Sequence, residues 1–132
     1  MASAEYLVFI SHSSKDRWIA RQMARLIEER GIRTFFDEKD FQGGDRIPET
    51  IKKNIKECKE LLVLLSSASV QSDWVKYEIA AAWALDKKLV PIVDKLSPEQ
   101  MPVLPEQVKA VDLNDFDNYL NNLVERAKRT AP

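Results

Sequence analysis

Few side chains in this sequence have the types and the spacing that chemistry needs. Trp74 and Glu78 are four residues apart, so on a helix they share one face. That spacing fits two interpretations: a surface glutamate that pairs with a lysine above a core tryptophan, or a carboxylate held beside an aromatic side chain in a binding site. His12 is the only histidine and Cys58 the only cysteine. A Ser-His-Asp triad would have to use His12, and neither an intrachain disulfide nor a cysteine-based zinc site can form.

The composition is that of one ordinary globular domain. The 132 residues suit a single domain over 1–132, with 45% apolar and 31% charged residues. A net charge of −1 argues against a nucleic-acid binder. The N-terminus lacks the pattern of a signal peptide, and the longest apolar run, residues 61–65, is too short to cross a membrane. We therefore expect a cytoplasmic protein without membrane or nucleic-acid partners.

Short apolar runs alternate with amphipathic segments along the chain. The runs predict strands at residues 6–10, 33–36, 61–65, 89–93 and, more weakly, 108–113. The stripes predict helices before Gly31, around Ile47, Ile51 and Ile55, over about 74–85, and from Phe116 to Ala127. Pro91 places the fourth strand near an edge of the sheet. We expect Phe9 to lie in the core and Cys58 to be a small buried apolar side chain.

This alternation predicts an α/β fold with a parallel sheet covered by helices on both faces. Five such strands favour the flavodoxin-like order 2-1-3-4-5, in which the first strand lies between the second and the third. The loops over residues 11–14, 37–46 and 66–73 would then converge at the carboxyl edge of the sheet. Ligands of open α/β sheets bind at that edge, so the fold alone points to one cleft.

Several familiar chemistries of this architecture are absent from the sequence. No Gly-x-Gly-x-x-Gly follows the first strand, and Gly43-Gly44 precedes Asp45-Arg46 rather than the Lys-Ser or Lys-Thr of a P-loop. A receiver domain needs acidic residues after the first and third strands. Those strands end here in Ser11-His12 and Ser66-Ser67, which excludes that class.

Four motifs in order resemble those of TIR domains and together span nearly the whole chain. They are Val8-Phe9-Ile10-Ser11-His12-Ser13-Ser14-Lys15-Asp16, then Phe36-Asp37-Glu38 with the loop to Gly43-Gly44-Asp45-Arg46-Ile47-Pro48, then Ser72-Asp73-Trp74-Val75-Lys76-Tyr77-Glu78, and Leu89-Val90-Pro91-Ile92-Val93-Asp94. The second is similar to the BB loop of the family, although many members have Pro-Gly at Gly43-Gly44. The motif style is closer to bacterial, NAD-cleaving TIR domains than to receptor adaptors.

The resemblance implies a catalytic role for Glu78. Enzymatic TIR domains place this glutamate in the cleft and use it to cleave NAD+. Breaking the nicotinamide–ribose bond builds an oxocarbenium-like centre, which one carboxylate can stabilise, and nicotinamide leaves as a neutral molecule. Neither a metal nor a cofactor is then required, and NAD+ is the substrate. Water as acceptor gives ADP-ribose, and attack from within the molecule gives a cyclic isomer.

The remaining predicted binding residues come from the converging loops. Backbone N–H groups at Ser11, His12 and Ser13 could meet a phosphate or the nicotinamide amide. Asp37 and Phe41 would rim the cleft, and Arg46 would contact phosphate or cap its loop. Two alternatives stay open at this level: His12 as an exposed loop side chain, and Trp74 as a core aromatic rather than a neighbour of the nicotinamide.

These residues support three hypotheses about function. The first is an NAD+ glycohydrolase or ADP-ribosyl cyclase in bacterial immune, antiviral or cell-death signalling. The second is a non-enzymatic module that signals by binding other TIR domains, and the third a nucleotide-directed transferase such as a deoxyribosyltransferase. The resemblance also implies self-assembly through the BB loop around Gly43-Gly44 and, since TIR effectors usually carry a sensor, a longer parent chain.

Overall fold

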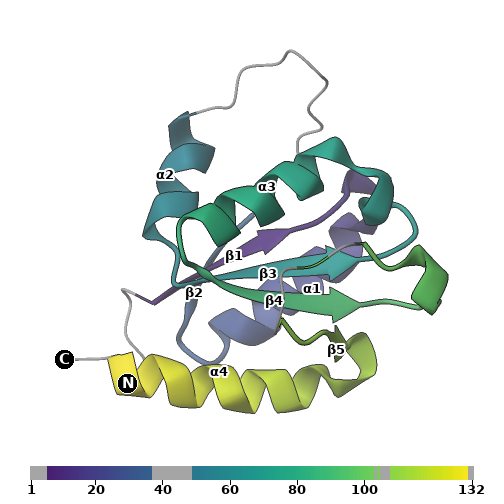
Figure 1. Cartoon of the computed structure of the whole chain (residues 1–132). Coiled ribbons are helices and arrows are strands. Elements are labelled where there is room, and N and C mark those ends of the chain that lie inside the picture. The colour runs from purple at the N-terminus through teal and green to yellow at the C-terminus, as the bar shows by residue number, and fades with distance from the viewer. Residues whose placement is uncertain (1–5, 37–48, 103, 105–107, 131–132) are drawn as a thin grey trace.

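A computed structural model of the chain describes residues 6–36, 49–102, 104 and 108–130. Within these ranges, parallel strands alternate with α-helices (Figure 1). The strands are β1 (Leu7–Ser11), β2 (Arg33–Phe35), β3 (Glu60–Leu65), β4 (Lys88–Val93) and β5 (Val111–Asp112). The helices are α1 (Arg17–Glu28), α2 (Glu49–Glu57), α3 (Asp73–Ala84) and α4 (Phe116–Thr130).

The sheet has the predicted flavodoxin-like order, β2-β1-β3-β4-β5, and every neighbouring pair is parallel. Since β1 pairs with β2 on one side and β3 on the other, its last residue lies in the middle of the carboxyl edge. Ser11 is the register partner of Val63 there, two residues before β3 ends. The predicted convergence of the first and third loops follows from this register.

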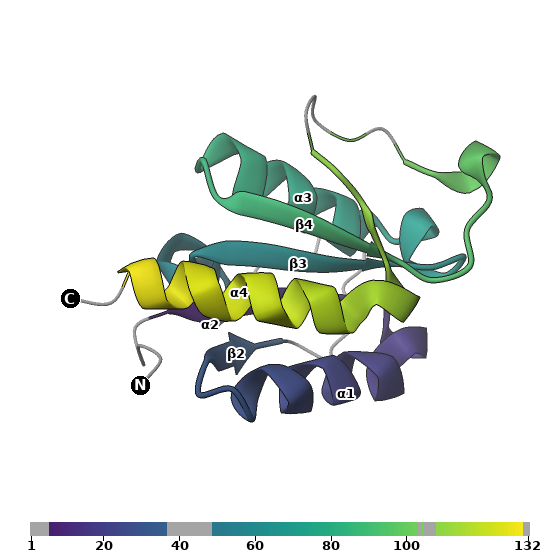
Figure 2. The same ribbon diagram turned by 90° about the horizontal axis from the view of Figure 1, so that it is seen from below.

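Alternation along the strands divides the core into two layers, as a pleated strand requires. Val8 and Ile10 of β1 belong to the cluster that also contains buried residues of α1 and α4. Leu7 and Phe9 belong to the cluster with α2 and α3, and Phe9 is fully buried as expected. Figure 2 shows α1 and α4 together on one side of the sheet, and α3 on the other. Both faces are therefore covered by helices.

The chain leaves α1 and α3 through residues with a left-handed backbone conformation. Gly31 has φ of 79°, a left-handed conformation that costs glycine little, and it turns the chain from α1 into β2. It lies two residues beyond the cap residue Glu29 rather than directly after the helix. At the end of α3 the cap is Leu85, and Asp86 has φ of 55° while Lys87 N–H donates to Ala82 at 2.8 Å. This is a Schellman motif with aspartate at the left-handed position.

The element boundaries differ from the sequence-based expectation mainly at the ends. β5 covers Val111–Asp112 rather than 108–113, because only these two residues form a ladder with Ile92 and Val93 of β4. β4 is fourth of five strands, and its outer neighbour is short, so Pro91 does lie near an edge. α4 continues to Thr130, three residues beyond the predicted apolar stripe.

A buried carboxylate at the first residue of β3 ties α4 to the sheet. Glu60 is fully buried and accepts hydrogen bonds from Tyr6 Oη at 2.6 Å and Tyr119 Oη at 2.8 Å. Arg126 donates to it through Nε at 3.0 Å and Nη2 at 2.9 Å. Burial, with Glu60 beside them, raises the pKa of both tyrosines. Four hydrogen bonds thus compensate for the burial of one charge.

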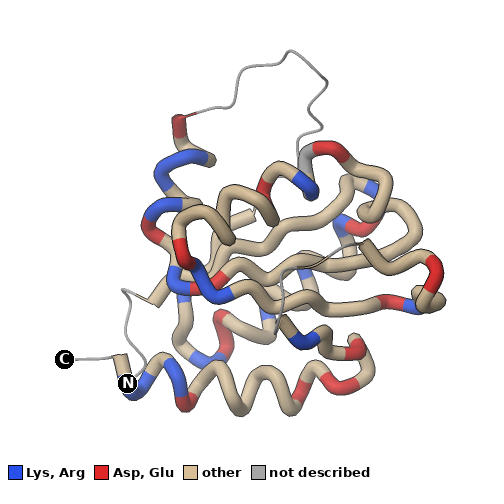
Figure 3. Tube along the Cα trace, viewed as in Figure 1, with Lys and Arg blue, Asp and Glu red and all other residues tan. Residues whose placement is uncertain are grey.

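Charged side chains of both signs are mixed over the described surface. Figure 3 shows Lys and Arg segments interspersed with Asp and Glu over the visible elements. None of the helices in the described ranges is both long enough and apolar enough to span a bilayer.

Candidate active site

The candidate site is built where β1 meets α3 at the carboxyl edge of the sheet. Leu7 and Phe9 of β1 face the layer of α2 and α3, so Ser11, two residues further, faces the same layer. Its Oγ donates a hydrogen bond of 2.5 Å to Oε1 of Glu78 in the second turn of α3. The exposed fractions are 1% for Ser11 and 2% for Glu78. A strand and a helix 67 residues apart in sequence thus meet through one polar pair.

Glu78 occupies a position on α3 where helical periodicity favours an apolar side chain. Val75 and Ala82 are buried in the α2–α3 layer, and Ile79 packs against it. Positions 75, 78, 79 and 82 form one face of a helix, so Glu78 lies in the face that covers the sheet. Burying a carboxylate costs several kcal/mol unless it is hydrogen-bonded or paired. A charge kept at such a position points to a functional constraint.

A second side-chain pair joins the segment that follows β1 to the loop over residues 66–73 that follows β3. Leu62 and Leu64 of β3 face the layer of α1 and α4, and Ser66, next in this alternation, donates its Oγ–H to Oδ2 of Asp16. Asp16 is the N-cap residue of α1. Ser69 Oγ accepts the backbone N–H of Ser66 at 2.8 Å, which closes the third loop on itself. The two loops that flank Ser11 and Glu78 are therefore held together by hydrogen bonds.

His12 is buried, which decides against the exposed-loop alternative. It is 6% exposed, and its Nδ1 lies 2.8 Å from the carbonyl oxygen of Ser13. That oxygen can only accept, so Nδ1 carries a proton. The imidazole packs edge-on against Phe36 at 5.7 Å between centroids, and Phe36 packs against the α1–α4 layer. Nε2 is buried and has no hydrogen-bond partner in the described part of the chain.

The fold places the predicted binding residues Ser11 and His12 toward opposite faces of the sheet. Ser11 lies with Glu78, whereas His12 packs toward the opposite layer of the sheet. Ser13 is half-buried, and its side chain accepts the N–H of Lys15 at 3.2 Å as the N-cap of a short 3-10 turn. Binding roles for these three residues stay predictions.

The rest of the predicted set lies outside what the structure describes. Asp37, Phe41 and Arg46, and the BB-loop pair Gly43-Gly44, fall in the range 37–48, which is not among the described residues. Trp74 is in the first turn of α3, as the spacing predicts, but its side chain is outside the description too. Their roles also stay predictions.

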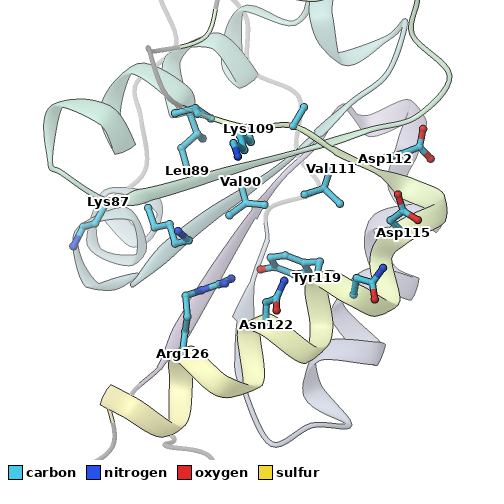
Figure 4. A pocket seen from close by; sticks show the side chains of 14 residues that line it. Lys87, Leu89, Val90, Lys109, Val111, Asp112, Asp115, Tyr119, Asn122 and Arg126 are labelled. Atoms are coloured by element: carbon cyan, nitrogen blue, oxygen red, sulfur yellow. The ribbon is translucent and has the colours of Figure 1, made fainter.

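A cavity of about 680 Å³ lies on the face of the sheet that is opposite to Glu78 (Figure 4). It opens where β4 and the segment before β5 diverge, above α4. Val90 and Val111 line it from the strands, and Tyr119, Asn122 and Arg126 from α4. Tyr119 and Arg126 already bind Glu60, so this cavity borders a structural cluster and not the carboxylate of the candidate site.

Cys58 and the acidic side chains of the described residues limit the chemistry that is available. Cys58 is fully buried, as predicted, and burial raises the pKa of its thiol from 9.0 to about 11. A thiol with such a pKa is protonated near neutral pH and is a poor nucleophile. Among the described residues, no group of three or more His, Cys, Asp or Glu side chains could hold a metal ion.

The sequence analysis predicted site roles for Glu78 and Ser11 but did not predict the hydrogen bond between them. The two side-chain pairs, Ser11 with Glu78 and Asp16 with Ser66, join residues that are 67 and 50 positions apart. One signal was readable: Glu78 interrupts an apolar stripe formed by Val75, Ile79 and Ala82. No local pattern indicates which hydroxyl would meet that carboxylate.

The fold and this edge define the class of protein. A sequence profile of the TIR domain family matches residues 8–126, so the chain belongs to the TIR domain family. It is similar to a protein of Brachypodium distachyon named a probable 2′ cyclic ADP-D-ribose synthase, with 30% identity over 127 residues, 95% of this chain and 54% of that one. It is also similar to the NAD(+) hydrolase TirS of Staphylococcus aureus, with 31% identity over 132 residues, 92% of this chain and 46% of that one.

A solved structure of the same family agrees with the fold. The TIR domain of the Toll-related receptor TRR-2 of Hydra magnipapillata superposes with a TM-score of 0.70 and 21% identity, covering 92% of this chain and 97% of that one. The present chain spans about half the length of the two curated relatives described above.

Proposed function

We propose that this TIR domain cleaves the bond between nicotinamide and ribose in NAD+, with Glu78 as the catalytic carboxylate. The observation that carries the proposal is the burial of Glu78 in the apolar face of α3, at the carboxyl edge of the sheet. Two relatives of similar sequence are named for NAD+ hydrolysis and cyclic ADP-ribose synthesis, which supports the same substrate.

The chemistry needs one negative charge beside the ribose. As the glycosidic bond lengthens, positive charge develops on the sugar while the nicotinamide ring becomes neutral. The Glu78 carboxylate stabilises that charge, and it acts more strongly where water is excluded, as its 2% exposure indicates. The ribosyl centre is then attacked by water, which loses a proton and gives ADP-ribose, or by a nucleophilic atom of the same molecule, which gives a cyclic product.

The same burial implies that the substrate reaches Glu78 only after the surrounding side chains rearrange. A carboxylate that is 2% exposed cannot contact the ribose of NAD+ in this arrangement. We therefore expect low activity of the isolated domain and higher activity in an assembled state that holds the site open. The proposal places the predicted rim residues Asp37, Phe41 and Arg46 beside NAD+ in that state.

Association with other TIR domains is the second part of the proposal. Large apolar side chains are exposed on α3 and directly after it: Tyr77 is 40% exposed, Trp83 65% and Leu85 44%. Exposed aromatic side chains on one helix are typical of surfaces that bind other proteins. The predicted BB-loop surface around Gly43-Gly44 would complete such contacts.

The decisive experiment follows NAD+ loss and nicotinamide release by the purified domain, at high concentration and with a crowding agent. The test variant is Glu78→Gln, which keeps the side-chain shape and removes the charge. The matched control is Glu125→Gln, because Glu125 is exposed on α4 and pairs with the exposed Lys128 at 3.8 Å. Thermal unfolding of all three proteins checks that they are folded.

We expect wild type and Glu125→Gln to release nicotinamide, and Glu78→Gln to lose activity by at least about 100-fold. Chromatography of the ribosyl product separates hydrolysis from cyclisation. Equal activity in Glu78→Gln would refute the catalytic role. No NAD+ loss under any assembling condition would favour a non-enzymatic module that signals by TIR–TIR contact.

A further inference from the structure

The hydroxyl group of Ser11 has one proton, and in this structure it is directed at Glu78. Ser11 Oγ lies 2.5 Å from Glu78 Oε1, and both side chains are buried. A serine hydroxyl can donate only one hydrogen bond. While that proton is held by the carboxylate, it cannot be donated to a ligand. Ser11 therefore acts on the site through Glu78.

We propose that Ser11 is a positioning residue that sets the orientation of the Glu78 carboxylate and favours its ionised form. This inference rests on the proposed function, since it assigns Ser11 a task in the reaction that Glu78 would catalyse. It also makes a claim about Glu78 that can be measured without any substrate.

The position of Ser11 suits this task. It is the last residue of β1 and the register partner of Val63 in β3, so the sheet fixes its backbone from that side. A glutamate has three rotatable side-chain bonds, and a donor fixed on a strand limits the conformations that keep the bond. Donation to a carboxylate favours its charged form, and charge-assisted hydrogen bonds are stronger than neutral ones.

The alternative is that Ser11 only satisfies a buried polar group. Two features of the Ser11–Glu78 pair favour a positioning role instead. An apolar residue on the face shared with Val75 and Ala82 would avoid the cost of burying a carboxylate, so packing alone does not favour Glu78. The Ser11–Glu78 bond also joins β1 and α3, which carry two of the four TIR-like motifs.

The test compares Ser11→Ala with Ser66→Ala. Ser66 is the matched control: it is a buried serine at the end of the neighbouring strand, and its hydroxyl donates to Asp16 rather than to Glu78. Ser11→Thr is the conservative variant that keeps a hydroxyl on a strand residue. Thermal unfolding of each variant accompanies the kinetics.

We expect Ser11→Ala to lower kcat by roughly 10- to 100-fold while KM changes by less than about 3-fold, because the lost interaction matters most as charge develops. Ser11→Thr should restore a substantial part of kcat. Ser66→Ala should lower stability without this loss of kcat. A kcat for Ser11→Ala equal to that of wild type, in an active protein, would overturn the inference.

A second measurement keeps this inference separate from the proposed function. The pKa of Glu78 is measured directly by carboxyl ¹³C NMR in wild type and in Ser11→Ala, with Glu78→Gln identifying the signal. We expect the pKa to rise by about one unit in Ser11→Ala, since one hydrogen-bond donor to the charged form is gone. If the pKa of Glu78 shifts but wild type does not cleave NAD+, the Ser11–Glu78 interaction is supported and the proposed NAD+ cleavage is refuted. An unchanged pKa of Glu78, whether or not NAD+ is cleaved, would refute the positioning role of Ser11.

Discussion

Replacing Glu60 by alanine should destabilise this domain strongly, although the residue lies far from Glu78 in the fold. Glu60 is fully buried and accepts four hydrogen bonds, two from tyrosine hydroxyls and two from Arg126. The Arg126 guanidinium also lies 5.7 Å from the centre of the Tyr119 ring. Burial lowers the pKa of Arg126, but the hydrogen bond and charge of Glu60 more than offset this. Without Glu60 these donors lose their shared acceptor.

The expected loss in the free energy of unfolding follows from the loss of these four hydrogen bonds. Removing one partner of a buried ion pair costs about 3–5 kcal/mol. Here Arg126, which is 24% exposed, and two buried tyrosine hydroxyls would lose their acceptor together. A domain of this size unfolds with about 5–15 kcal/mol, so the variant should still fold but with a small margin. With a urea slope of about 2 kcal/mol per M, the unfolding midpoint should fall by about 2 M.

The assay is urea unfolding followed by circular dichroism, with Glu125→Ala as the control. Glu125 pairs with Lys128 at 3.8 Å, and the side chains are 61% and 63% exposed, so its loss should change stability by less than about 0.5 kcal/mol. A double-mutant cycle with Arg126→Met then measures coupling. We expect the double variant to cost about 1–3 kcal/mol less than the sum of the single variants. A cost below about 1 kcal/mol for Glu60→Ala, or strict additivity, would refute this reasoning.

Two further predictions concern alkaline pH and protein concentration. Burial raises the pKa of the Cys58 thiol from 9.0 to about 11. Between these pH values the folded state keeps a proton that the unfolded state releases. The contribution of Cys58 to the free energy of unfolding should therefore be complete below about pH 9 and fall by about 2–3 kcal/mol as the pH rises to about 11. Urea melts of Cys58→Ala should lack this component, and identical pH slopes in the two proteins would contradict it. NAD+ cleavage per mole of domain should rise with protein concentration in a dilution series, and Trp83→Glu should weaken the rise, because Trp83 is 65% exposed on α3. Strict proportionality between rate and concentration would count against assembly as the activating step.

The sequence predicted the architecture because the signals for it are local. The apolar run at residues 61–65 favours a strand buried on both faces, and the spacing of Ile51 and Ile55 favours one side of a helix; both elements are observed. The order β2-β1-β3-β4-β5 then followed from the general rules for parallel sheets. The shortness of β5 did not, because pairing with Ile92 and Val93 depends on where β4 lies and not on local propensity.

The sequence alone also singled out Glu78 as the predicted catalytic residue, through its place in a TIR-like motif and not through its spacing from Trp74. Only the tertiary structure decided what that charge meets. Ser11 and His12 are neighbours in sequence, yet strand alternation sends the first toward Glu78 and the second toward Phe36 on the other layer. The pairs Ser11–Glu78, Asp16–Ser66 and Tyr6–Glu60 join residues 50 or more positions apart. Such contacts depend on how whole elements pack against one another, and no window along the chain contains that information.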